Sequence, residues 1–218
     1  MFTFMEDDGR AVQDTEYFNF DHAKNQILQK SPEEISRRAS VEFDRENSCF
    51  RFQSLGQDIT VSYPECRASF TVNKKTPIVT WHFPILHYLA TADGCALSGE
   101  LTSFAHIEKY VAHPQQFESD TGGRLLKLLD TIPLEKLKQA CFAFNGEMMQ
   151  SNADLYVKFS FTPKVDIFLK LWLADDEMPG SAKLLFDKNC ARYLQSIDIN
   201  FAGPLLAGFL VKHCNFSA

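Results

Sequence analysis

The sequence predicts an α+β fold in which two antiparallel β-hairpins form one or two sheets with about six helices packed around them. Two pairs of short segments alternate apolar and polar residues on either side of a turn signal, which is typical of hairpins. Other segments place apolar residues three or four apart, as helices do. The two patterns are grouped along the chain, which favours α+β over a doubly wound parallel sheet. No Pro-, Gly- or Ser-rich break divides residues 15–218, which are expected to form a single domain behind a loose, acidic lead-in over residues 1–14.

The first helical region predicts two helices in succession. Residues 15–30 carry apolar side chains on roughly one helical face. A second helix is expected to begin after Ser31, because Ser31 can cap it, Pro32 suits the first helical position and Glu34 completes a capping box.

The two hairpins are predicted from alternation of period two. The first covers residues 49–63 around a turn at 54–57, and residues 68–72 can add a third strand. The second covers residues 154–173 around a turn at 162–164. The apolar residues of the second hairpin that are expected to face one way are Leu155, Val157, Phe159, Phe161, Val165, Ile167, Leu169 and Leu171.

The stretch between the hairpins predicts a helix over residues 76–94. Thr76 can cap it and Gly94 can end it. Pro84 falls inside, so the helix either kinks there or begins near it. Residues 98–114 carry mixed signals and predict an irregular segment with one short strand.

Further helices are expected towards the C-terminus. Residues 122–144 predict two helices that are broken near residues 131–133. After the second hairpin, a short helix is expected to begin after Ser181. The last helix is predicted over residues 197–211, with an interruption at residues 203–204, where Gly is followed by Pro.

Composition limits the class of protein. The net charge of −6 argues against nucleic acid as a partner, because such affinity comes mostly from Lys and Arg at phosphates. No apolar stretch approaches the roughly 20 residues of a membrane helix. The six cysteines form no C-x-x-C pair, which indicates a reducing compartment and a cytoplasmic location. Neither a G-x-S-x-G nor a phosphate-loop pattern occurs, so an enzymatic activity stays undecided.

Three consecutive acids form the first candidate site. Asp175, Asp176 and Glu177 follow an apolar run, and Asp187 ends the next one. One interpretation is a solvated turn placed before the positive end of a helix that begins after Ser181. A second is an oxygen site for Mg²⁺, Ca²⁺ or a cationic ligand group, although the spacing differs from a calcium loop and no metal is assigned. A third is acid–base chemistry, because crowded carboxylates raise one another's pKa.

The segment "WHFPILHYL" forms the second candidate site, with His87 and Tyr88. A histidine in so apolar a segment is commonly a hydrogen-bonded core residue. Alternatively, His87 and Tyr88 line a cleft, where His87 acts as a base or as an axial ligand of a metal in a large ring. The 20 phenylalanines are compatible with a large planar ligand, and equally with an aromatic core.

Three motifs resemble a bacterial family of unknown function, domain of unknown function 3786 (DUF3786). They are "ILHYL", "LSGELTSF" and "DDEMPGSAKLLFD", in the family's order, and the likeness extends over residues 15–213. The chain departs from the family pattern at Leu101, where a tryptophan is usual. The matching positions are His87, Tyr88, Leu89, Gly99, Glu100, Phe104, Asp176, Glu177, Pro179, Ala182, Leu185, Phe186 and Asp187.

The resemblance implies a metabolic context and no particular activity. Relatives look as if they occur in anaerobes, beside iron–sulfur proteins and corrinoid-dependent methyl-transfer proteins. The resemblance therefore implies a link to tetrapyrrole or corrinoid metabolism, with an iron–sulfur or corrinoid protein as a partner. This context is an association and assigns no residue a role.

Three functional hypotheses follow. The leading one is a ligand-binding or accessory module in which His87, Tyr88 and the acids stand at the mouth of an apolar pocket. The second is an acid–base or metal-assisted enzyme that uses residues 175–177 together with His87. The third is a protein-interaction domain, which predicts an exposed apolar patch in place of a concave site. The first two require His87 and Asp176 to converge on one cavity.

Overall fold

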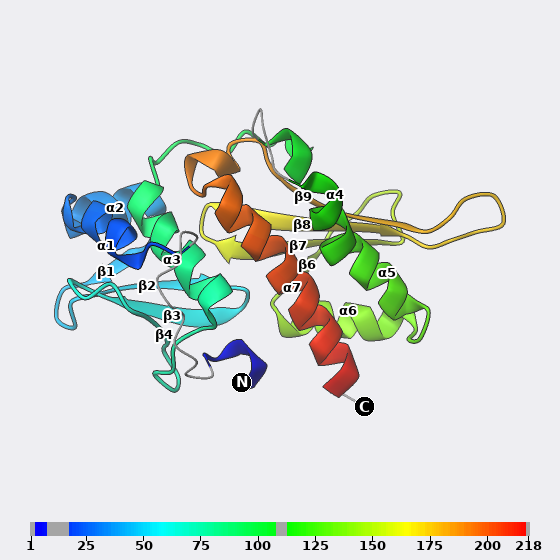
Figure 1. The fold of residues 1–218 in the computed structure, drawn as a ribbon, viewed down its shortest axis with the longest axis horizontal. Helices are drawn as coiled ribbons and strands as arrows, with labels where there is room; N and C mark the ends of the chain where they lie inside the picture. Colours follow the sequence, from blue (N-terminus) through cyan, green and yellow to red (C-terminus); the bar gives the residue numbers. More distant parts are fainter. Residues whose placement is uncertain (1–2, 8–17, 108–112, 217–218) are drawn as a thin grey trace.

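The computed structural model describes residues 3–7, 18–107 and 113–216, and it contains two antiparallel sheets (Figure 1). The prediction of an α+β fold is confirmed. The first sheet has the order β1-β2-β3-β4, and the second has the order β5-β9-β8-β7-β6. The strands of the first sheet are β1 (Glu42–Asp44), β2 (Cys49–Ser54), β3 (Gln57–Ser62) and β4 (Ala68–Phe70). Those of the second are β5 (Leu101–Ser103), β6 (Glu147–Met148), β7 (Leu155–Thr162), β8 (Val165–Trp172) and β9 (Ser181–Asp187).

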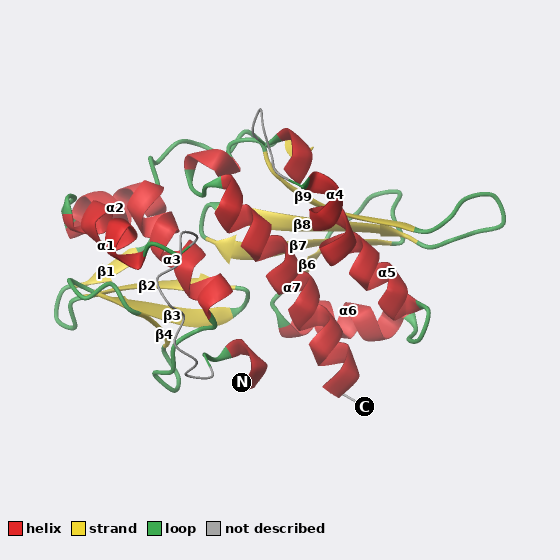
Figure 2. Cartoon of the chain, viewed as in Figure 1, coloured by secondary structure: helices red, strands yellow, loops and turns green. Residues whose placement is uncertain are grey.

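The helices of the described residues pack around these sheets (Figure 2). They are α1 (Phe20–Leu28), α2 (Pro32–Ala39), α3 (Val79–Thr91), α4 (Pro114–Glu118), α5 (Arg124–Leu129), α6 (Leu134–Ala143) and α7 (Ser196–Phe216). Short helical turns occur at Thr3–Met5, Phe104–His106, Ser119–Gly123 and Cys190–Arg192. Among the described residues, no helix combines the length and the apolar character that a membrane span requires.

Both predicted hairpins are confirmed. Strands β2 and β3 pair from Cys49↔Ser62 to Ser54↔Gln57, and β4 adds the expected third strand. Strands β7 and β8 pair around the turn at residues 162–164. Every inward-facing apolar residue predicted for the second hairpin is buried, with at most 3% exposure. The period-two pattern therefore identified both the strands and their core face.

The predicted cap of α2 is also confirmed. The Ser31 hydroxyl accepts a hydrogen bond from the Glu34 backbone N–H at 3.2 Å, and Pro32 occupies the first turn. The predicted cap of α3 is wrong, because that helix begins at Val79 with Ile78 at its N-cap and no side-chain cap. Helix α3 runs through Pro84 to Thr91 and ends before Gly94.

Two expectations near the C-terminus are wrong. Residues 181–187 form strand β9 and not a helix, because the run pairs with β8 from Ile167↔Phe186 to Trp172↔Ser181. A short apolar run fits the periodicity of a helix as well as that of a strand, and pairing with a neighbouring strand selects the strand. Helix α7 is continuous from Ser196 to Phe216 and is not interrupted at Pro204. Tertiary packing maintains this helix, which packs against α3 and α6.

The two sheets meet at Trp81 of α3. Its indole N–H donates to the Ser54 hydroxyl at 2.8 Å, and that hydroxyl donates to the Phe161 carbonyl at 2.5 Å. Ser54 belongs to β2 and Phe161 to β7, so one short chain of hydrogen bonds joins α3 to both sheets. The Leu55 N–H adds a direct link to the Ser160 carbonyl at 2.8 Å.

Residues 3–7, which belong to the predicted lead-in, pack onto this body. Met5 is fully buried, and the Ile78 N–H donates to its carbonyl at 3.1 Å. Glu6 forms an ion pair with Lys75 at 2.7 Å. The remainder of the lead-in, residues 1–2 and 8–14, lies outside the described residues.

Candidate functional site

His87, the first predicted site residue, lies in the core between two helices. It projects from α3 and is 5% exposed, and its Nδ1 donates to the two carboxylate oxygens of Asp198 at 2.8 and 3.0 Å. Asp198 is fully buried in the first turn of α7, where it also accepts from the Gln195 N–H at 2.9 Å. The carboxylate thus closes the start of α7 in the manner of a capping box and ties it to α3. The imidazole packs on the ring of Phe83, with centroids 4.0 Å apart.

Tyr88 is a core residue as well. It is fully buried, and its hydroxyl donates to the Ala39 carbonyl at the end of α2. Burial raises the pKa of the Tyr88 phenol above its usual value. The two adjacent residues therefore bind α3 to different helices, His87 to α7 and Tyr88 to α2.

Asp187 anchors a loop. It is 5% exposed at the end of β9 and accepts from the N–H groups of Ser98, Gly99 and Asn189 at 2.8–3.0 Å, as well as from the Ser98 hydroxyl at 3.1 Å. Gly99 has φ +74°, a conformation that favours glycine. Burial by itself would raise the pKa of the Asp187 carboxyl, but the donors of Ser98, Asn189 and Gly99 outweigh it and hold the pKa below its usual value. The motifs "LSGE" and "LLFD" are thus joined through this one carboxylate.

Asp187→Asn is expected to remove a pH-dependent contribution to stability. Because the folded-state pKa of Asp187 is depressed, its contribution is present above the unfolded pKa of about 3.9 and is lost as the pH falls through the folded-state value. We expect the free energy of unfolding to fall by about 1.5–3 kcal/mol near neutral pH. Urea denaturation over a series of pH values should show the difference from the wild type shrinking below about pH 4.

Asp176→Asn is the matched control, because Asp176 is exposed. Its effect should stay within about 0.5 kcal/mol at every pH. A difference between the wild type and Asp187→Asn that persists unchanged at acidic pH would contradict the role assigned to the Asp187 carboxylate.

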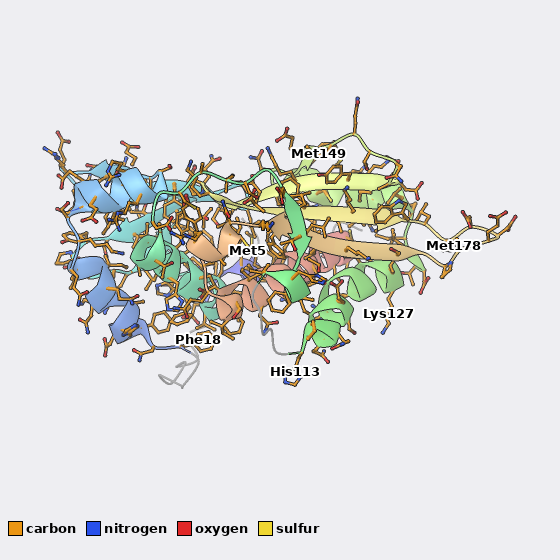
Figure 3. The ribbon with its side chains drawn as sticks, turned by 90° about the horizontal axis from the view of Figure 1, so that it is seen from above. Met5, Phe18, His113, Lys127, Met149 and Met178 are labelled. Carbon is orange, nitrogen blue, oxygen red and sulfur yellow. The ribbon has the colours of Figure 1, made fainter. Side chains whose placement is uncertain are left out.

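The three consecutive acids lie at the tip of the β8–β9 hairpin. We call residues 173–180 the arm; it projects beyond the rest of the molecule (Figures 1 and 3). Asp175 Oδ1 accepts from the N–H groups of Glu177 and Met178 at 2.9 and 2.7 Å, which closes the turn. These backbone donors, that of Met178 first, lower the pKa of Asp175. Asp176 and Glu177 are exposed.

The predicted site residues are therefore distributed over three places. His87 and Tyr88 are in the helical core, Asp187 holds a loop, and Asp175, Asp176 and Glu177 are on the projecting arm. Within the part of the chain that the structure describes, no group of three His, Cys, Asp or Glu side chains is placed to hold a metal ion.

A different surface of the second sheet carries the features of a binding site. Helices α4, α5 and α7 lie on one side of β7, β8 and β9, and the residues that face them are buried (Figure 3). The alternate residues point to the opposite side and are half-buried or exposed. We call this second side the open face. Its residues on the three central strands are Tyr156, Lys158, Ser160, Asp166, Phe168, Lys170, Trp172, Ser181, Lys183 and Leu185.

Aromatic and cationic side chains are interleaved on the half of the open face that is nearer the arm. The group consists of Tyr156, Phe168, Lys170, Trp172 and Lys183, and we call it the aromatic–lysine band. Lys170 and Lys183 are direct cross-strand partners, and the Lys170 ammonium lies 4.5 Å from the centroid of the Tyr156 ring. Like charges that face each other across two strands destabilise a sheet. An anionic partner that binds at this pair would be attracted by both lysines.

Neither ammonium group of this pair is in an ion pair with another described residue. The charge of Lys183 does reach Glu118, whose pKa is raised by burial and lowered in part by that lysine. The apolar residues exposed near the open face lie at its edges and on the arm. They are Leu101, Met148, Leu173 and Met178, with exposures of 36–67%.

A polar hollow of about 510 Å³ lies at the end of the open face that is farther from the arm. It is lined by Asn145, Gly146, Glu147, Lys158, Ser160, Pro163 and Asp166. Lys158 and Glu147 pair with each other at 2.5 Å, which raises the pKa of Lys158. Burial raises the pKa of Asp166, and the charge of Lys158 partly offsets this rise. The lining of this hollow is polar, and its charged groups satisfy one another. Pockets that enclose small ligands are, by contrast, mostly apolar.

Sequence reasoning did not single out the open face, although its signal was present. The alternation that identified the core residues of β7 and β8 also assigns Tyr156, Phe168 and Lys170 to the other side. The opposition of Lys170 and Lys183 needed the pairing of β8 with β9, and that pairing was hidden by the helix expected after Ser181.

Among the described residues, fold and surface define an α+β protein with two antiparallel sheets, and one face of the second sheet presents half-buried or exposed aromatic and cationic side chains. The chain belongs to the family described as Domain of unknown function (DUF3786), whose model matches residues 31–208. The resemblance found in the sequence is thereby confirmed. The matched range contains both sheets and the arm. Comparison with curated proteins and with solved structures finds no match.

Proposed function

We propose that this protein is a binding module that docks an acidic segment of a polypeptide on the open face of its second sheet. One observation carries the proposal: Lys170 and Lys183 lie directly opposite each other among the half-buried rings of Tyr156, Phe168 and Trp172. Carboxylates of a partner would relieve the repulsion between the lysines. The aromatic rings would supply contact area, and such rings are enriched where proteins bind one another.

The charge distribution favours a polypeptide over a nucleic acid. The chain has a net charge of −6. The lysine pair lies between the acidic arm on one side and Glu147 and Asp166 on the other. A phosphate chain that follows the face would meet these acids, because it carries a charge at every nucleotide. A short acidic peptide segment can place its charges at the lysines alone.

The other two hypotheses depend on residues that the structure separates. A planar tetrapyrrole or corrinoid ligand at His87 needs access to a ring that is 5% exposed and held by Asp198. Carboxylate chemistry with His87 needs Asp175 to Glu177 near it, whereas these acids lie at the tip of the arm. The docking function uses residues that are adjacent and accessible. An iron–sulfur or corrinoid protein, the partner that the resemblance implied, would qualify if it presents an acidic segment.

The proposal is tested with a fluorescein-labelled peptide of about eight residues that alternates Glu and Leu. Its anisotropy should rise on addition of the wild-type protein. Lys170→Glu/Lys183→Glu should weaken binding by about tenfold or more, because it turns two attractions into repulsions. Binding should also weaken with added salt, since the charges are near the surface.

The matched control is Arg124→Glu/Lys127→Glu, which makes the same charge change on α5; Figure 3 labels Lys127 on the helical side of the sheet. This variant should bind the peptide within about twofold of the wild type. Trp172 supplies a second signal, since the other tryptophan, Trp81, is fully buried. Equal binding by both charge variants would refute the proposal, as would binding of a single-stranded oligonucleotide in place of the peptide.

A further inference from the structure

We propose that the acidic segment is supplied by a second copy of this chain, with the arm of each copy lying on the aromatic–lysine band of the other. This inference rests on the proposed function and names its partner. It makes the protein a symmetric dimer held by two identical contacts.

The arm has the chemistry that the band requires. It carries the carboxylates of Asp175, Asp176 and Glu177 next to the side chains of Leu173 and Met178, which are 43% and 67% exposed. The Asp175 turn, in which the Asp175 N–H also donates to the Met178 carbonyl at 3.0 Å, closes this tip with three hydrogen bonds. A turn closed by its own hydrogen bonds loses less conformational entropy on docking than an open loop does. Methionine beside aromatic rings adds a favourable sulfur–aromatic contact.

The position of the arm allows reciprocal contacts. Arm and band belong to the same ribbon of β8 and β9, and Lys170 precedes Asp176 by six positions, which is roughly 20 Å of extended strand. Two such ribbons can cross in antiparallel orientation at the base of the arm, near Leu173. Each tip then lies over the lysine pair of the other copy. In a two-fold dimer, a contact from one copy to the other is always repeated in reverse.

The arm of a second copy would reach the band from the open face and not along the edge of β9. At that edge the Ser119–Gly123 turn packs on Ala182, where a Cβ at Gly122 would lie 2.0 Å from the Ala182 carbonyl oxygen. Lys183 is exposed, so its ammonium group is accessible to the arm.

A charge exchange between copies tests the inference. The band variant is Lys170→Glu/Lys183→Glu, and the arm variant is Asp176→Lys/Glu177→Lys, which leaves the Asp175 turn intact. Sedimentation equilibrium at low salt should show a wild-type dimer. Each variant alone should dissociate at least about tenfold more readily, because its band and arm have the same sign of charge.

The two variants mixed in equal amounts should form a heterodimer, since both arm–band contacts then join opposite charges. This rescue also shows that the variants are folded. Arg124→Glu/Lys127→Glu should dimerise like the wild type. A monomeric wild type at all accessible concentrations would overturn the inference, as would a dimer that neither variant weakens or a mixture that fails to associate.

The labelled acidic peptide separates the failure of this inference from the failure of the proposed function. If the inference holds, the monomeric arm variant binds the peptide more tightly than the wild type does, because its band is no longer occupied. If the wild type is monomeric yet binds the peptide through Lys170 and Lys183, the docking function stands and the second copy is rejected. If the peptide does not bind even the arm variant, both proposals are rejected.

Discussion

Asp198→Ala is expected to lower the free energy of unfolding by about 3–5 kcal/mol, the loss found when one partner of a buried ionic or hydrogen-bonded pair is removed. The substitution removes the acceptor of the buried His87 Nδ1 and of the Gln195 N–H at the start of α7. Water has little access to the His87 donor, because Asp198 is fully buried and His87 is 5% exposed. Urea denaturation followed by circular dichroism measures the change.

A double-mutant cycle with His87→Ala separates the interaction energy between His87 and Asp198 from the contributions of their other contacts. Each single substitution should be costly, and the double variant should lose clearly less than the sum of both. Asp198→Asn is the conservative control, because it keeps the size of the side chain and one accepting oxygen, and it should lose less than Asp198→Ala. Additive effects in the cycle, or a loss below about 0.5 kcal/mol for Asp198→Ala, would show that the pair does not hold α3 to α7.

Trp81→Ala is expected to cost about 3–5 kcal/mol as well, the range for removal of a large buried aromatic side chain. Trp81 is fully buried between the rings of Phe70 and Phe209, at centroid distances of 5.5 and 5.3 Å, and it donates to Ser54. Its removal leaves a cavity at the junction of the two sheets. We propose on this basis that the sheets form one domain and unfold together.

Urea curves followed by circular dichroism and by tryptophan fluorescence test this proposal. In Trp81→Ala the remaining tryptophan, Trp172, reports on the second sheet, whereas circular dichroism reports on the whole chain. The two curves should coincide. Phe142→Ala removes an aromatic side chain that is 60% exposed and should change stability by no more than about 0.5 kcal/mol. Separate transitions for the two probes would show that the sheets are independent units.

Much of the fold was predictable from local patterns. The strands β2, β3, β7 and β8 follow from period-two alternation around turn residues, and the cap of α2 follows from Ser31, Pro32 and Glu34. These signals are local, because each depends on residues within one turn or one strand.

The wrong predictions concern segments whose secondary structure is decided by contacts with residues far away in the sequence. Residues 181–187 can satisfy a helix or a strand, and pairing with β8 selects the strand. Gly203 and Pro204 signal a break, yet α7 continues because it is packed on both sides by the core.

The candidate site was less predictable than the fold. His87 is 111 positions from Asp198, and no local pattern in the sequence connects them. The open face was encoded in the alternation of β7 and β8, but the opposed lysines appear only once β9 is placed beside β8. A cluster formed across strands depends on register, and a shift by one residue would turn every side chain to the other face.

The sequence by itself determined the class of fold and the inward face of the second hairpin, because periodicity and capping act over a few residues. The family was indicated separately, by the resemblance of three motifs. Only the tertiary structure decided that His87 is a core residue bound to Asp198, that Asp187 anchors a loop, and that the three acids stand on a projecting arm. The physical reason is that a polar side chain acts according to its burial and its partners, and both are set by contacts between segments far apart in the chain.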